Sequence, residues 1–148
     1  MDYIQKRIRK SKIGAMEGLL KSQPYVEAQI AKTEEQISDI DHVLDIGAVS
    51  SISVVNSHHS TSPSLESRHA QLILEKQELL TKLCRLKSEK ADIDAVYCSA
   101  GSEGRLLLEL RYRRNLTFDQ ISSRTAMSRD TVRRTIETIL ANYEKEKK

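Results

Sequence analysis

Residues 117–134 read TFDQISSRTAMSRDTVRR and carry the signals that decide the fold of the C-terminal part of the chain. Thr117 followed three residues later by Gln120 has the spacing of a capping box, which predicts a short helix. Residues 125–127 have the composition of a tight turn, and Ser128 is a typical N-cap for the helix that follows. A short helix, a turn of about three residues and a capped second helix together predict a helix-turn-helix.

The apolar residues of this stretch have the spacing that such a motif requires. Met127 and Val132 follow Ile121 by six and eleven residues, which lets the three side chains meet in the angle between the helices. With that packing, the polar residues at the start of the second helix face outward. In a helix-turn-helix this part enters the major groove and reads base edges. The side chains that we predict to face DNA there are Ser128, Arg129, Thr131, Arg133 and Arg134.

Arginine dominates the basic residues around the motif. Residues 105–134 contain eight arginines, no lysine and only three acidic residues. A guanidinium group can bridge a phosphate or a guanine edge, so this composition favours recognition over simple solubility. We predict that residues flanking the second helix complete the interface, chiefly through phosphate contacts: Thr117, Arg111, Arg113, Arg114 and Arg124.

Two plainer interpretations stay open at this point. The basic residues are also compatible with a solvated face, and the helix pair with a hairpin that only completes a core. For Arg133 and Arg134 individually, a phosphate contact or full solvation fits the pattern as well as a base contact does.

Upstream, the pattern predicts a second region of long helices. From Pro24 to about residue 46, and from Pro63 to about Tyr97, apolar residues recur with alternating spacings of four and three, as in a coiled coil. The second helix is about 50 Å long, too long for the shorter one to cover, so we predict that it also packs against another copy of the chain. Lys76 and Lys90 interrupt its seam.

The remaining segments complete an all-α prediction. We predict a first helix over about residues 2–20. Its apolar residues are expected on one face: Ile4, Ile8, Ala15, Met16, Leu19 and Leu20. Residues 47–64, of which seven are serine, predict a flexible polar loop, with a short strand at 51–55 as the alternative. Ser62 is the expected N-cap of the long helix. Two glycines within residues 98–104 suggest a hinge, which divides the chain into a helical oligomerisation region, 1–100, and a helix-turn-helix domain, 101–148.

Composition excludes several classes of function. No apolar run approaches the ~18 residues of a membrane span, no secretory signal follows the basic N-terminus, and two separated cysteines make no disulfide framework, so we expect a cytoplasmic protein. His58, His59 and His69 lack carboxylate or cysteine partners at ligand spacing, so we predict no metal and no cofactor. Neither a phosphate-binding loop nor a nucleophile elbow is present, so we do not expect an enzyme.

The C-terminal third resembles a known DNA-binding module. Residues 107–112 (LLELRY), 116–122 (LTFDQIS) and 127–134 (MSRDTVRR) are similar to the domain of bacterial sigma factors that reads the −35 promoter element. The whole layout, with its Pro24-Tyr25 break, polar loop, long helix and terminal sigma-like module, resembles late transcription activators of the ArpU/RinA type from phages and prophages of Gram-positive bacteria. The sequence departs from the sigma pattern at Thr125, at Ala126 and in the four-residue step from Val132 to Ile136.

The resemblance implies a sequence-specific activator of phage late genes in a bacterial cytoplasm, with double-stranded DNA and RNA polymerase as candidate partners. A second hypothesis is a phage small terminase subunit, which would bind packaging DNA, although such subunits usually place the DNA module first. A third is a helical adaptor that docks its basic module on RNA polymerase. A closed ring would favour the second hypothesis, and absence of salt-sensitive DNA binding would favour the third.

Overall fold

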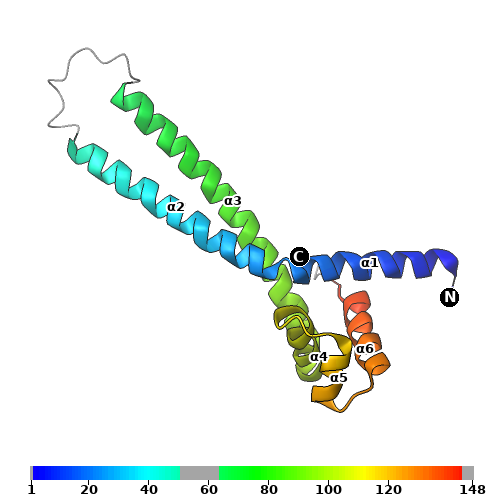
Figure 1. Ribbon diagram of the computed structural model, residues 1–148. Helices are drawn as coiled ribbons and strands as arrows, with labels where there is room; N and C mark the ends of the chain where they lie inside the picture. Colours follow the sequence, from blue (N-terminus) through cyan, green and yellow to red (C-terminus); the bar gives the residue numbers. More distant parts are fainter. Residues whose placement is uncertain (1, 51–63, 145–148) are drawn as a thin grey trace. The chain divides into compact units, whose positions relative to one another are not determined.

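The computed structural model describes residues 2–50 and 64–144, and all regular structure in these ranges is helical, as predicted. The elements, labelled in Figure 1 except for η1, are α1 (Tyr3–Lys21), α2 (Gln23–Ser50), α3 (Leu65–Ser99), α4 (Gly101–Leu108), the π-helical turn η1 (Glu109–Arg113), α5 (Phe118–Thr125) and α6 (Arg129–Asn142). No helix in the described part of the chain is both long enough and apolar enough to cross a membrane.

The chain forms two compact units. One comprises Met1–Tyr25 with Glu89–Lys148, and the other comprises Val26–Ser88. The predicted division at residue 100 falls at the turn between α3 and α4, inside the first unit. The reason is that α1 and the end of α3 share one core with the C-terminal helices.

The core of the first unit is aliphatic with two tyrosines. Leu20 from α1 and Ile93 and Val96 from α3 are fully buried together with residues of α4, α5 and α6. The fully or almost fully buried C-terminal members are Leu107, Leu108, Ile121, Val132, Ile136 and Leu140. Since each buried aliphatic side chain contributes about 1.5–3 kcal/mol, the helix-turn-helix derives much of its stability from helices outside the motif.

The turn from α3 into α4 depends on glycine. Gly101 has φ +73°, a left-handed conformation that costs glycine nothing and most other residues about 1–2 kcal/mol. Gly104, one turn later, is buried where α4 approaches α6, and a Cβ atom there would lie 2.7 Å from Ile139 Cδ1. These two glycines suggested a hinge in the sequence. In the structure Gly101 allows the chain to turn between α3 and α4, and Gly104 allows α4 to pack closely against α6.

The second unit is an antiparallel pair formed by the facing parts of α2 and α3 (Figure 1). The predicted seam of α2 is buried or half-buried along its length, with Val26, Thr33 and Ile40 most enclosed. The Thr33 hydroxyl donates to the Gln29 carbonyl at 2.6 Å, which satisfies the single polar group of the seam. Of the two lysines that interrupt the α3 seam, Lys76 forms an ion pair with Asp41, whereas Lys90 is exposed. The seam of α2 is therefore covered within one chain, and association between copies stays a prediction.

Helix α1 packs differently from the prediction. Ile13, Met16, Leu19 and Leu20 face the core, whereas Ile4, Ile8 and Ala15 are exposed. The predicted single face was wrong, because Ile4 and Ile8 lie on another side of the helix from Ile13 and Leu20 and precede the part of α1 that meets the core.

Two helix ends also differ from the prediction. Helix α2 continues through Gly47 to Ser50, past the point where the loop was expected to begin. At the start of α3, Ser64 Oγ accepts a hydrogen bond from the Ser67 amide at 3.2 Å, so Ser64 acts as the N-cap. Ser62, Pro63 and the strand suggested at residues 51–55 lie outside the described residues.

Candidate nucleic-acid interface

The two helices of the predicted motif begin at the predicted caps. Thr117 Oγ1 accepts from the Gln120 amide at 3.2 Å, and the Gln120 side chain accepts from the Thr117 amide at 2.9 Å, which completes the capping box of α5. Ser128 Oγ accepts from the Thr131 amide at 3.2 Å and caps α6. Each cap satisfies amide groups that a helix start leaves without partners.

The turn between these helices depends on Ala126. This residue ends α5 in the left-handed conformation, with φ 57° and ψ 20°. Glycine adopts that conformation without steric cost, whereas the alanine Cβ crowds the neighbouring carbonyl. The turn therefore adopts a left-handed conformation even though alanine makes it more strained than glycine would.

Buried side chains lock the angle between α5 and α6. Ile121 and Val132 are completely buried, and Met127 packs against the same core, as their spacing predicted. The Ser122 hydroxyl donates to the Met127 carbonyl and ties α5 to the start of α6. Ile136 is also buried, so the four-residue step after Val132 is accommodated on the inner face of α6.

The predicted base-facing residues lie on the outer side of α6. All five, from Ser128 to Arg134, are exposed. Two of the arginines have ion partners: Arg129 Nε lies 3.7 Å from Asp119, and Arg133 lies 3.9 Å from Asp130. Both pairs are long and solvated, and such pairs contribute about 0–1 kcal/mol. Their guanidinium groups can therefore move to a phosphate or a base at little cost.

Two of the predicted flanking arginines contact other side chains of the protein, although Arg113 remains exposed. The Arg111 guanidinium lies over the Phe118 ring, 4.2 Å from its centroid, and donates to the Leu116 carbonyl at 3.0 Å. The Arg113 guanidinium lies 4.3 Å from the Tyr97 ring centroid and donates to the Gln23 side chain at 3.4 Å. These contacts give both residues a structural role that the sequence pattern did not indicate.

The other flanking residues face solvent. Arg114 and Arg124 are exposed, as is Arg134 on α6, and in the described ranges none of the three has a side-chain hydrogen bond or an ion pair. Thr117 is exposed with its hydroxyl engaged in the capping box. The arginines free for a new anion are thus Arg114, Arg124 and Arg134, followed by the weakly paired Arg129 and Arg133.

The chain between η1 and α5 sets the position of Arg114. The π-helical turn ends with the Arg114 amide donating to the Glu109 carbonyl at 3.0 Å, and Asn115 then has φ 55°. The Leu116 amide donates back to the Leu110 carbonyl at 3.0 Å. Asparagine tolerates this left-handed conformation better than most residues do. The local sequence gives no sign of this wider π turn.

A partly buried polar contact links helix α1 to this region. The Tyr112 hydroxyl donates to the Glu17 carboxylate at 3.2 Å. Burial first, and then the Glu17 charge, raise the pKa of the Tyr112 phenol well above its ordinary value. Burial also raises the pKa of Tyr97, although the positive charge of Arg113 opposes this. Glu17 was missed because nothing in its local sequence marks it as a partner of a residue 95 positions away.

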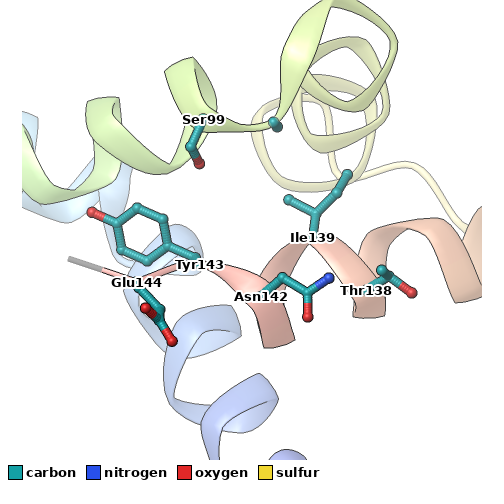
Figure 2. Close-up of a pocket in the computed structure, with 7 residues that line it drawn as sticks. Ser99, Thr138, Ile139, Asn142, Tyr143 and Glu144 are labelled. Atoms are coloured by element: carbon teal, nitrogen blue, oxygen red, sulfur yellow. The ribbon is translucent and has the colours of Figure 1, made fainter. Parts of the chain in front are cut away.

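One pocket of about 430 Å³ lies at the other end of α6 (Figure 2). It is lined by Ser99 at the end of α3, by Ala100 in the turn to α4, and by residues between Thr138 and Glu144. None of the predicted DNA-facing residues lines it. Among the described residues no cluster of histidine, cysteine or acidic side chains could hold a metal ion, and His58 and His59 lie outside those residues.

Comparison with known proteins identifies the family. A family model described as "Protein of unknown function (DUF722)" matches residues 23–145, which extend from the start of α2 past the end of α6, and the chain therefore belongs to this family. No curated protein and no solved structure matches the chain.

Proposed function

We propose that this DUF722 protein binds double-stranded DNA through α5 and α6, with the start of α6 in the major groove. The observation that carries this proposal is the outer side of α6. There the capped start of α6 exposes Arg129, Thr131, Arg133 and Arg134 to solvent. The buried Ile121 and Val132 fix the angle between α5 and α6. A buried hairpin that only completed a core would not need three exposed arginines along one helical start.

The charges support contact with a polyanion. Five arginines around the motif are free or only weakly paired, and Arg114 and Arg124 stand next to the two ends of α5. The positive end of the α6 dipole at Ser128 adds to the attraction of a phosphate. By this reasoning Arg134 and Arg133 are the candidate base readers, and Arg114 and Arg124 are the candidate phosphate contacts.

The finer proposal is a transcription activator of phage late genes, with packaging and structural operons as targets. It draws on the similarity of residues 107–134 to the promoter-reading domain of sigma factors and on the ArpU/RinA-like layout. In that role the protein acts at a promoter in the bacterial cytoplasm, next to RNA polymerase, and needs no catalytic group or cofactor.

The test is a double substitution, Arg133→Ala/Arg134→Ala, measured by fluorescence anisotropy on DNA selected by the wild-type protein. Each base-contacting arginine contributes about 1–3 kcal/mol, so the double variant should lose at least about 30-fold in specific affinity. The matched control, Arg68→Ala/Arg85→Ala, removes the same charge from exposed positions of α3. Unchanged affinity in the α6 variant would refute the assignment of α6 as the reading helix.

A further inference from the structure

The N-terminal part of α1, residues 3–12, is a strongly basic helix that leaves the core of its unit; we call it the basic arm. It contains Lys6, Arg7, Arg9, Lys10 and Lys12 and no acidic residue. Several of these cations stand three or four residues apart, where like charges on a helix repel. A bare helix of this composition is weakened by its own charge, so contact with an anionic surface would stabilise it.

The basic arm also carries exposed apolar side chains. Tyr3, Ile4 and Ile8 are 76%, 63% and 62% exposed. Ile4 and Ile8 lie one turn apart, and by helical geometry Arg7 and Lys12 flank them on either side. An apolar strip bordered by cations is typical of a helix that docks on a protein surface with acidic borders.

The position of the arm disfavours the DNA groove as its partner. Helix α1 contacts α6, and Figure 1 shows it beside the C-terminal end of α6. The reading end of α6 begins at Ser128, twelve residues before the buried Leu140, which corresponds to about 18 Å along the helix. The five cations of the arm thus lie at the opposite end of α6 from the proposed DNA contacts.

The chain itself contains a surface that matches the arm. Residues 26–46 of α2 hold six acidic residues and one lysine, against five cations on the arm. Asp41 and Glu34 are ion-paired to Lys76 and Lys87 of α3, whereas Glu35 and Asp39 form no ion pair within the described residues. Glu35 and Asp39 are exposed on the outer side of α2, away from the buried Thr33 and Ile40. Val43 follows at the next four-residue step, is half exposed and borders Ile40. We call these three residues the acidic face.

We propose that the basic arm of one copy docks on the acidic face of α2 in a second copy. A contact between copies is favoured because only Ser22 separates α1 from α2, whereas an antiparallel helical hairpin needs a loop of about two to five residues. Pairing of two arms is disfavoured by the repulsion of their charges. If two copies exchange arms reciprocally, the contact closes as a symmetric dimer.

The experiment is sedimentation velocity of the full chain without DNA, so its outcome does not depend on the proposed function. Wild-type protein should associate at micromolar concentration, less so at high salt. The arm variant, Arg7→Glu/Lys10→Glu, and the face variant, Glu35→Lys/Asp39→Lys, should each weaken association about tenfold or more, because attraction becomes repulsion. An equimolar mixture of the two variants should recover association, because the glutamates on the arm of the first variant then meet the lysines on the face of the second.

The control variant, Arg68→Glu/Arg85→Glu, makes the same change of charge on exposed positions of α3 and should associate like wild type. Should a charge variant fold poorly by circular dichroism, Ile4→Ser/Ile8→Ser tests the same contact without changing charge and should also weaken it. A strictly monomeric wild type, an arm variant that associates normally, or a mixture that stays apart would overturn the proposal. So would an arm variant that loses only DNA affinity, since the arm would then belong to nucleic acid.

Discussion

Replacing Ala126 by glycine should stabilise the first unit, which is unusual for a substitution that removes a methyl group. Ala126 has φ 57°, a conformation that costs a residue with a Cβ atom about 1–2 kcal/mol relative to glycine. Its side chain is exposed, so removing it sacrifices little buried area. Glycine also raises the conformational entropy of the unfolded chain, which lowers the free energy of unfolding by about 0.4–1 kcal/mol and offsets part of this gain. The expected net gain is about 0.5–1 kcal/mol.

The matched control is Ala91→Gly, on an exposed position inside α3 of the same unit. There the backbone is helical, and glycine costs about 1 kcal/mol relative to alanine. One chemical change should therefore raise stability at residue 126 and lower it at residue 91.

Urea denaturation followed by tyrosine fluorescence measures both variants. All five tyrosines belong to the first unit, so this signal reports on the unit that contains the motif. The midpoint should rise for Ala126→Gly and fall for Ala91→Gly, with the denaturant slope unchanged. Equal destabilisation by the two substitutions would refute the left-handed turn, and with it the geometry that connects α5 to α6.

Three further predictions concern the same unit and use urea denaturation, followed by circular dichroism for the alkaline series because ionised tyrosine loses its fluorescence. Thr117→Ala should cost about 1 kcal/mol, because the Gln120 amide loses its acceptor, and Thr117→Ser should retain most of the stability; an Ala variant as stable as wild type would contradict the cap. Gly104→Ala should cost about 1–3 kcal/mol, since its Cβ would meet Ile139 Cδ1 at 2.7 Å. Ile139→Val in the same chain should restore part of this loss, and absence of rescue would argue against the close approach. Above about pH 10 the wild type should lose stability with rising pH, because the unfolded Tyr112 ionises there while the folded one, with its raised pKa, keeps its proton. Tyr112→Phe should be about 1 kcal/mol less stable at neutral pH and less sensitive to alkali, and an unchanged alkaline slope would refute the role of this phenol.

The elements of the motif could be predicted because their signals are local. Thr117, Gln120 and Ser128 act on amides within three residues, and the offsets among Ile121, Met127 and Val132 decide which side of each helix is buried. For the same reason the seam residues of α2 and the long helix α3 were visible in the sequence.

Contacts between distant segments left no such signal. The prediction separated residues 1–100 from the motif, whereas Leu20, Ile93 and Val96 lie in the same core as α6. Composition predicted phosphate contacts for Arg111 and Arg113, and that prediction stays open. Only the fold shows Phe118 and Tyr97 beneath their guanidinium groups. The periodicity of α1 suggested one apolar face, because local spacing does not reveal where a partner helix stops.

The measurement that tests the central proposal most directly is a genome-wide footprint of the purified protein on the DNA of its own host or phage. We expect protection at a small set of discrete sites upstream of genes, abolished by Arg133→Ala/Arg134→Ala while folding is retained. Protection without sequence preference, or a footprint that this variant reproduces, would contradict a reading helix at α6.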